Sequence, residues 1–198
     1  IERENTTMRR RDLAGLALAA ASTPLPALAQ GTQRPQAGGG GEERLLLDLK
    51  DGPVTIQFLP EVAPRHVERI KALARRGFYD GTPFHRVIEN FMAQGGDPTG
   101  TGTGGARDQG YPDLPAEFTN RYRFIRGVCG MARSGDPNSA NSQFFIMFAP
   151  ASSLDGQYTI WGRVVSGMEA VDKIKRGTGN NGMVQGPDKL LRARIVAA

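Results

Sequence analysis

The fold is decided by residues 84–98, which read Phe-His-Arg-Val-Ile-Glu-Asn-Phe-Met-Ala-Gln-Gly-Gly-Asp-Pro. This run predicts two short extended segments that carry one arginine, Arg86, an apolar pair, Phe91 and Met92, and one amide, Gln94. Because successive side chains of a strand point to opposite faces, His85 should face away from Arg86 and form a hydrogen bond inside the fold. Taken alone, Arg86 is interpreted as a surface arginine of a strand pair.

Two further motifs follow along the chain, Ser139-Ala140-Asn141-Ser142-Gln143-Phe144-Phe145-Ile146 and Leu154-Asp155-Gly156. Together with the first run they resemble the cyclophilins, the cyclosporin-binding family of peptidyl-prolyl cis-trans isomerases. The resemblance extends over roughly residues 44–197. It implies a mainly β fold, a closed eight-stranded antiparallel β-barrel capped by two α-helices.

The composition is that of an ordinary globular domain. The chain has 198 residues, enough for one domain with a hydrophobic core. Its net charge of +5 comes without a dense run of Lys or Arg, which favours solubility and argues against a nucleic-acid partner. The single cysteine, Cys129, lies in a small apolar run and is expected to be a buried core thiol. Two His and one Cys argue against a structural zinc site, and no cofactor is expected.

The N-terminal region has the features of an export signal. The first methionine is Met8, so residues 1–7 are interpreted as an upstream remnant. Residues 8–29 are predicted to be a secretory signal peptide, with a basic start, a short Leu- and Ala-rich run and the small-residue cleavage site Ala27-Leu28-Ala29. The apolar run is much shorter than the roughly 20 residues that span a bilayer. No stable membrane anchor is therefore expected after cleavage.

The export route stays open at this point. Arg10-Arg11-Asp12-Leu13 also resembles a twin-arginine signal, so the Sec and twin-arginine routes are both consistent with the sequence. Either route predicts a mature chain that begins at Gln30 and a periplasmic location. Residues 30–43 have almost no apolar content and are interpreted as a flexible linker before the folded domain, residues 44–198.

Hydrophobic periodicity predicts the secondary structure of this domain. Alternating apolar residues over 45–49 and 54–58, joined by Asp51-Gly52, predict a β-hairpin. Helices are expected from Pro64 to a stop at Gly77, with His66 on the surface, and over 168–176. Many short strands indicate a barrel or a sandwich, and only the resemblance selects the barrel. Further strands are predicted near 83–88, 91–95, 128–132, 143–147, 158–165 (with Trp161 in the core) and 190–196.

The chemistry that the resemblance implies needs no cofactor. Rotation about a prolyl peptide bond breaks no covalent bond, so a site has only to bind the twisted amide better than its planar forms. At the twist the nitrogen becomes pyramidal and regains a lone pair. A guanidinium is permanently charged and offers several N–H donors. Arg86 is therefore the candidate catalytic residue, and the resemblance implies the same role.

The resemblance also implies a set of substrate-binding residues. Spacing alone would place the aromatic residues of the strands in the core, but the adjacent Phe144 and Phe145 must point to opposite faces. The motif assigns Phe145 to the groove. The implied proline pocket is Phe91, Met92, Phe145 and Leu154. Gln94 and Gln143 match positions near the bound peptide, the backbone of Ala132 and Arg133 would pair with it, Gly102 matches a position in the groove wall, and Tyr158 is compatible with lining the groove.

Some positions depart from the family pattern. Ser153 stands where many eukaryotic members have Trp, and Tyr158 where they have His. Loss of the indole, with its donor and apolar surface, predicts that cyclosporin binding is weak. Arg133 stands where Asn is frequent, a change that a backbone contact tolerates. Gly100-x-Gly102-x-x-Gly105 fits a dinucleotide fingerprint, but it opens no helix and is interpreted as a flexible loop.

Two functional hypotheses remain. The first is a peptidyl-prolyl isomerase that accelerates rotation of X-Pro bonds in unfolded or flexible segments and so assists protein folding. The second is a cyclophilin-like module or chaperone that binds proline-containing polypeptides without significant turnover. The second would tolerate loss of Arg86, whereas the first requires it.

Overall fold

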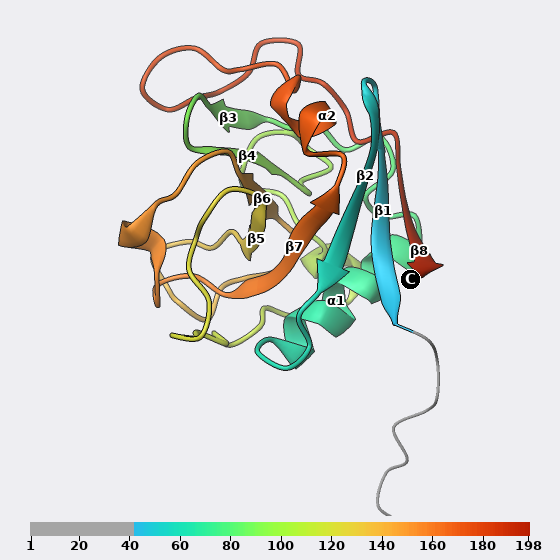
Figure 1. Cartoon of the computed structure of the whole chain (residues 1–198), viewed down its shortest axis with the longest axis vertical. Coiled ribbons are helices and arrows are strands. Elements are labelled where there is room, and N and C mark those ends of the chain that lie inside the picture. The colour runs from blue at the N-terminus through green and yellow to red at the C-terminus, as the bar shows by residue number, and fades with distance from the viewer. Residues whose placement is uncertain (1–41) are drawn as a thin grey trace, which may run out of the picture. The chain divides into compact units, whose positions relative to one another are not determined.

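The computed structural model describes residues 42–198, so the predicted signal peptide and nearly all of the predicted linker lie outside the described residues. Within this part the protein is mainly β, with two α-helices (Figure 1). The strands are β1 (Glu43–Leu49), β2 (Gly52–Phe58), β3 (Arg86–Ile88), β4 (Met92–Gly95), β5 (Val128–Met131), β6 (Phe144–Met147), β7 (Ile160–Ser166) and β8 (Arg192–Ala197). The helices are α1 (Pro64–Arg75) and α2 (Met168–Asp172), with short 3₁₀ turns at Arg107–Gln109 and Ser152–Leu154.

The strands form one curled antiparallel sheet in the order β3-β4-β6-β5-β7-β2-β1-β8. The helices α1 and α2 lie at opposite ends of this sheet (Figure 1). Within residues 42–198, the terminal strands β3 and β8 share no ladder, so the sheet is a curled half-barrel and the predicted closed barrel is not confirmed. Backbone bonds nevertheless join the flanking segments, from Phe84 N to Asp188 O (2.9 Å) and from Leu190 N to Thr82 O (2.9 Å).

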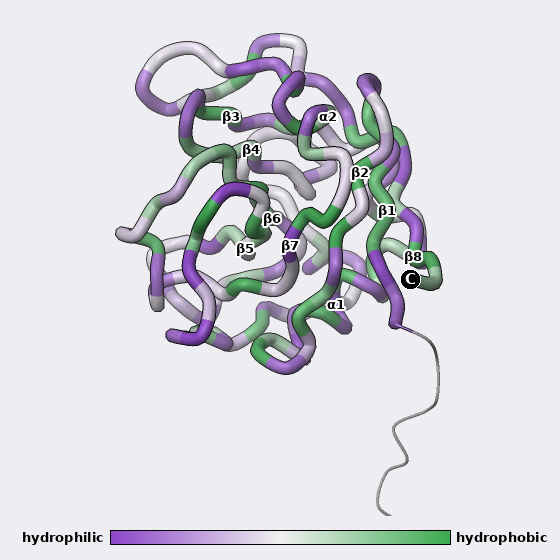
Figure 2. Tube along the Cα trace, viewed as in Figure 1, coloured by the Kyte–Doolittle hydropathy of each residue, from purple (hydrophilic) through white to green (hydrophobic). Residues whose placement is uncertain are grey.

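The predicted hairpin is present in the expected register. Leu45 pairs with Ile56 and Leu47 with Val54, and all four side chains are buried. The turn uses Gly52 at φ +136°, a conformation that glycine adopts without a steric penalty. The positions between these buried residues are only partly buried: Thr55 is polar, whereas Leu46 is apolar. Figure 2 shows the hydropathy along these strands.

Helix α1 begins at Pro64, as predicted, and packs an apolar face on the sheet. Its first turn is capped from a distant loop, because the Glu117 carboxylate accepts the backbone N–H groups of Arg65 (3.2 Å) and His66 (3.1 Å). The same carboxylate lies 2.6 Å from His66 Nδ1. The prediction of a surface His66 is therefore wrong: the loop that carries Glu117 covers this end of the helix and leaves the imidazole fully buried.

Helix α2 ends at Asp172, four residues before the predicted end. The reason is a side chain that replaces helical hydrogen bonds at its C-terminus. Arg176 Nη1 donates to the carbonyl oxygens of Asp172 (2.8 Å) and Ile174 (2.5 Å). Since these two carbonyl oxygens have a side-chain donor, the chain can leave the helix here without leaving them unsatisfied.

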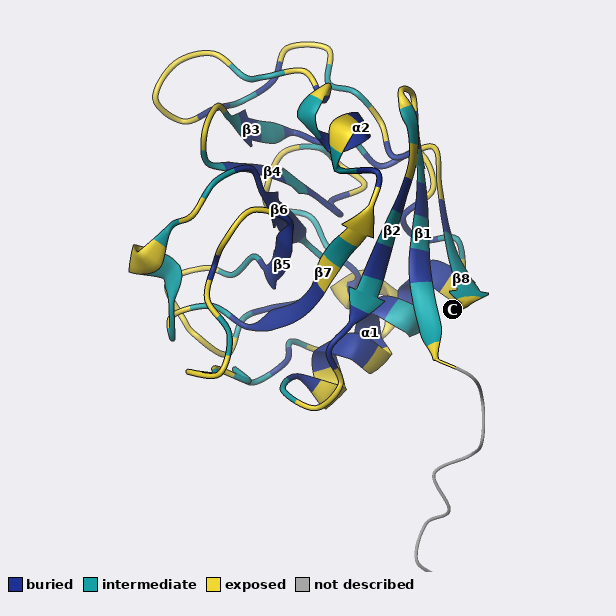
Figure 3. Ribbon diagram, in the orientation of Figure 1, coloured by how far each residue is buried: buried dark blue, intermediate teal, exposed yellow. Residues whose placement is uncertain are grey.

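The interior is divided between two apolar clusters. The larger fills the curl of the sheet and includes the fully buried Trp161 and Cys129, as predicted. Burial raises the pKa of the Cys129 thiol, which keeps it protonated and unreactive. The smaller cluster contains Met92, Phe124 and Phe145 and lies beneath the candidate site. Figure 3 shows β5 and β6, at the middle of the sheet, as the most uniformly buried strands.

Within residues 42–198 no helix is long and apolar enough to cross a membrane.

Candidate active site

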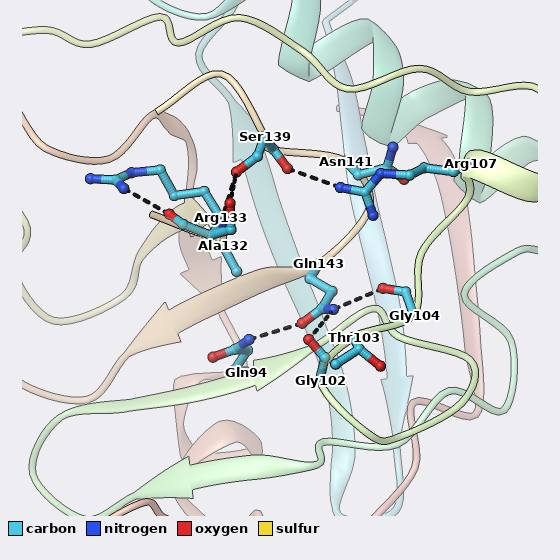
Figure 4. A pocket seen from close by; sticks show the side chains of 11 residues that line it. Gln94, Gly102, Thr103, Gly104, Arg107, Ala132, Arg133, Ser139, Asn141 and Gln143 are labelled. Carbon is cyan, nitrogen blue, oxygen red and sulfur yellow. Dashed lines mark hydrogen bonds between the residues drawn. The ribbon is translucent and has the colours of Figure 1, made fainter. Parts of the chain in front are cut away.

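Two adjoining pockets form a groove beside β3, β4 and β6. They share three lining residues, Gln94, Ala132 and Arg133, so a bound chain can pass from one to the other. Every site residue predicted from the sequence lines one or both of them. The first pocket is lined by Arg86, Phe91, Met92, Gln94, Ala132, Arg133, Phe145, Leu154 and Tyr158. The second (Figure 4) is lined by Gln94, Gly102, Thr103, Gly104, Arg107, Ala132, Arg133, Ser134, Ser139, Asn141 and Gln143.

The first pocket has an apolar floor of closely packed side chains. Phe145 packs against Phe124, with ring centroids 5.6 Å apart, and meets Tyr158 edge to face at 5.7 Å. Phe144, the preceding residue, turns to the opposite side and packs edge to face on Trp161 in the core. The prediction that these neighbours face opposite sides is confirmed. The aromatic part of the pocket floor therefore packs against neighbouring rings on more than one side.

One cationic side chain is fixed at the edge of this pocket. Arg86 lies opposite Gln94 in the β3–β4 pair. Its Nη1 donates to Gln94 Oε1 at 3.2 Å, and its Nε donates to the carbonyl oxygen of Asn181 at 2.9 Å. A guanidinium has five N–H donors, so three of them have no partner within residues 42–198. Both acceptors are neutral and leave the positive charge of Arg86 uncompensated.

A chain of side-chain amides connects Arg86 with the loop that walls the second pocket. Gln94 Nε2 donates to Gln143 Oε1 at 2.9 Å, and Gln143 Nε2 donates to the carbonyl oxygens of Gly102 (3.0 Å) and Gly104 (2.8 Å), as drawn in Figure 4. Each amide uses its oxygen and its nitrogen in this chain. The orientation of both glutamines is therefore determined by their partners.

The loop itself is held by Asp97, which the sequence analysis did not single out. Its carboxylate accepts the backbone N–H groups of Thr99 (2.8 Å), Gly102 (2.7 Å) and Gly104 (3.1 Å). Burial alone would raise the pKa of Asp97, but these bonds and that from the Thr99 hydroxyl lower it below its usual value. A Cβ at position 104 would lie 2.1 Å from Asp97 Oδ1, so glycine is required there. As predicted, the glycine run opens no α-helix and is a loop.

His85 lies under this loop, on the side of β3 away from Arg86, as predicted. Its imidazole is buried, and a Cβ on Gly102 would be 3.6 Å from its Nε2. The expected hydrogen bond is absent: neither ring nitrogen has a partner with hydrogen-bond geometry within the described residues. Burial lowers the pKa of His85, against smaller opposing effects of Asp97 and the Pro83 carbonyl. The neutral ring thus supports the loop by packing.

Other residues of the groove were not predicted. Arg107 lines the second pocket and pairs with Asp113 at 2.8 Å. Asn141 Oδ1 accepts a hydrogen bond from the backbone N–H of Ala106 at 2.8 Å and so closes the loop that follows the glycines. Asn181 contributes a backbone carbonyl, which no side-chain pattern reveals. Of the three family departures, Arg133 lines both pockets and Tyr158 lines the first, whereas Ser153 lines neither.

Comparison with known proteins agrees with this geometry. Residues 45–195 match the family described as "Cyclophilin type peptidyl-prolyl cis-trans isomerase/CLD". The chain belongs to the cyclophilin family and is a peptidyl-prolyl cis-trans isomerase. Within residues 42–198 no cluster of His, Cys, Asp and Glu could hold a metal ion.

Relatives and solved structures give the same family. A probable peptidyl-prolyl cis-trans isomerase of Brucella abortus is 50% identical over 193 residues, covering 91% of this chain and 95% of that protein. The isomerase CYP18-2 of Arabidopsis thaliana is 38% identical over 159 residues, covering 79% of this chain and 96% of that protein. A cyclophilin-type isomerase of Cryptosporidium parvum, crystallised in the presence of the dipeptide Ala-Pro, has a TM-score of 0.69 and 25% identity over 78% of this chain and 99% of its own.

Proposed function

We propose that the first pocket binds the proline ring of an X-Pro segment and that Arg86 is the catalytic residue that stabilises the twisted amide. One observation carries this proposal: a guanidinium held by two hydrogen bonds, with three N–H donors that have no partner within residues 42–198, lies at the edge of a pocket whose floor is apolar. The proline ring would contact Phe91, Met92, Phe145, Leu154 and Tyr158. Arg86 would donate to the lone pair that the proline nitrogen regains at the twist.

Such a site can supply the transition-state stabilisation that catalysis of this rotation requires. The barrier to rotation is about 18–20 kcal/mol, and uncatalysed exchange takes tens to hundreds of seconds. A turnover of about 10³ per second needs a barrier lower by ~7 kcal/mol. A hydrogen bond from a charged donor supplies roughly 1.5–3 kcal/mol. The remainder must come from holding the flanking backbone so that the twisted form fits best.

The substrate backbone would be held by the wall that the two pockets share, which includes Ala132 and Arg133. The segment Ala132–Arg133 follows β5 and lines both pockets. Its Ala132 N–H already donates to the Gln143 carbonyl oxygen at 2.9 Å, so an extended substrate would pair with the remaining backbone groups like an added strand. Gln94 and Gln143 offer amide groups next to this wall. The Ala-Pro dipeptide present with the Cryptosporidium neighbour supports proline-containing segments as the ligand class.

The alternative for this groove is that it binds proline segments without significant turnover. The test measures cis–trans exchange of a short X-Pro peptide by NMR with the full chain, together with the peptide Kd. Acceleration by several decades supports turnover at this groove. Binding without acceleration would replace the proposal with the binding module.

We further propose that the protein acts in the periplasm after export and assists the folding of exported clients. The support is the order of features in residues 8–29, a basic start, a short apolar run and a small-residue cleavage site. Export of the chain after Arg10→Lys and Arg11→Lys tests the route. Continued processing would count against the twin-arginine signal and favour Sec.

Two finer proposals concern closure and drug binding. We infer that the barrel closes through residues 82–84 and 188–190, supported by the backbone bonds between them, and expect slow hydrogen exchange of the Phe84 and Leu190 amides. Exchange as fast as in exposed loops would mean an open edge.

Cyclosporin binding is proposed to be weak because Ser153 supplies no indole. Calorimetry should therefore show tighter cyclosporin binding for Ser153→Trp.

A further inference from the structure

The groove has an unbalanced positive charge. Arg86 and Arg133 both line the first pocket, and Arg133 also lines the second, where Arg107 joins it. Among residues 42–198, no Asp or Glu lines either pocket. Of these three arginines only Arg107 has a carboxylate partner within that range, because it forms an ion pair with Asp113 at 2.8 Å. Two uncompensated guanidinium groups therefore face the space in which a substrate segment would lie.

Arg133 is held in place without losing its charge. Its Nε donates to the carbonyl oxygen of Gln157 at 3.1 Å, and its Nη1 donates to those of Ser134 (2.9 Å) and Gly135 (3.3 Å). Its Cζ lies 4.6 Å from the centroid of the Tyr158 ring, a pocket-lining residue. All of these partners are neutral. The side chain is thus ordered before substrate arrives, and its charge remains available.

Several other arginines of the described chain are neutralised by carboxylates. Arg75 pairs with Glu43 at 2.6 Å, and Arg126 pairs with Asp172 at 2.6 Å. Within residues 42–198, Arg86 and Arg133 form no ion pair with a carboxylate. A carboxylate brought by the substrate would find an ordered cation, whereas an ammonium would be repelled.

We propose that this enzyme selects proline segments that carry an Asp or Glu within two or three residues of the proline, and discriminates against Lys there. Arg133 is the specificity-determining residue. The inference rests on the proposed function, because it needs the substrate to lie in this groove. The preferred clients would be acidic segments that contain proline.

A purely structural role for Arg133 makes a different prediction. If the side chain only braces Tyr158 and the turn at residues 134–135, its replacement changes kcat/KM for every peptide by the same factor. An electrostatic role changes the ratio between acidic and basic peptides and leaves a neutral peptide nearly unaffected. The ratio also depends on salt, since the screening length falls from about 10 Å at 0.1 M to about 3 Å at 1 M.

The experiment uses the full chain and five peptides that differ at one position. One is neutral, and the others carry Asp or Lys two residues before or two residues after the proline. NMR exchange at low peptide concentration gives kcat/KM for each. On at least one side of the proline we expect the Asp peptide to exceed the Lys peptide roughly three- to tenfold at low salt, and much less at 1 M salt.

Matched variants identify the residue responsible. Arg133→Gln should bring the Asp/Lys ratio close to one, and Arg133→Lys should retain most of it. Arg163→Gln is the control: Arg163 lies on β7 outside both pockets, forms no ion pair within the described residues, and bonds to Gln57 Oε1 at 2.9 Å. It should leave the ratio unchanged. Thermal unfolding establishes that each variant is folded.

Two results would overturn the inference. The parent could turn over Asp and Lys peptides equally on both sides, or Arg133→Gln could keep the parent's ratio. In either case continued turnover of the neutral peptide would leave the proposed function intact, so the two failures are distinguishable.

Discussion

Arg86 and Gln94 face each other across β3 and β4, and a hydrogen bond of 3.2 Å from the guanidinium Nη1 to Oε1 joins them. Gln94 is in turn held by Gln143, which is held by the carbonyl oxygens of the loop at Gly102 and Gly104. The position of the proposed catalytic cation therefore depends on a chain of neutral amides. Because these amides carry no charge, they orient the guanidinium without reducing its positive potential.

Removal of the first amide tests this dependence. Gln94→Ala frees Nη1 of Arg86 and should lower kcat about tenfold, equivalent to about 1.4 kcal/mol of transition-state stabilisation, with a smaller change in KM. Gln143→Ala removes a contact one step further away and should cost less in kcat. Saturation kinetics by NMR exchange measure both. A Gln94→Ala enzyme with unchanged kcat would show that Arg86 needs no such support.

The two adjacent phenylalanines of β6 should separate stability from activity. Phe144 lies in the core, so Phe144→Ala should lower the free energy of unfolding by about 3–5 kcal/mol. Phe145 has one side toward the pocket, so Phe145→Ala should cost less stability but lower kcat/KM more. Urea unfolding and NMR exchange give the two quantities. The reverse ranking would contradict the assignment of Phe145 to the groove.

Asp97 should stabilise the loop of the second pocket through its charge. Asp97→Asn keeps the shape but places an amide against backbone N–H donors, and should cost about 2 kcal/mol in the free energy of unfolding. Asp108→Asn is the matched control, since Asp108 is exposed and its carboxylate accepts no hydrogen bond within the described residues. Equal unfolding free energies for the two variants would refute the role of Asp97.

Stability should decrease as the solution becomes acidic. Burial lowers the pKa of His66, against the opposing effect of Glu117, and burial also lowers that of His85. As the pH falls, the unfolded chain therefore binds protons before the folded chain does. The contribution of these histidines to the free energy of unfolding is complete above their unfolded pKa, about 6.5, and is lost as the pH falls toward their folded pKa. Each histidine contributes a slope of up to about 1.4 kcal/mol per pH unit.

Urea unfolding between pH 7.5 and 5 measures this slope. His85→Gln removes one titrating group and should give a shallower dependence than the parent. Identical slopes for the two proteins would mean that His85 does not titrate differently in the folded and unfolded states.

Sequence reasoning succeeded where a local pattern determines the outcome. Alternation located the hairpin, and the rule of opposite faces separated Phe144 from Phe145. It failed where segments far apart in the sequence meet, since the loop with Glu117 buries His66, and where a side chain replaces helical bonds, since Arg176 donates to the carbonyl oxygen of Asp172, the last residue of α2. The groove was predicted through family motifs, but the backbone carbonyl of Asn181, which holds Arg86, belongs to a segment far along the chain and has no side-chain signature.

The central claim is that Arg86 acts on the twisted amide and not on ground-state binding. The most direct measurement compares kcat and peptide Kd for the parent, Arg86→Lys and Arg86→Ala, by NMR exchange and titration, with folding checked by thermal unfolding. We predict that Arg86→Ala stays folded, binds the peptide with a Kd close to that of the parent, and loses most of its kcat, with Arg86→Lys in between. A folded Arg86→Ala protein with the parent's kcat would contradict the account.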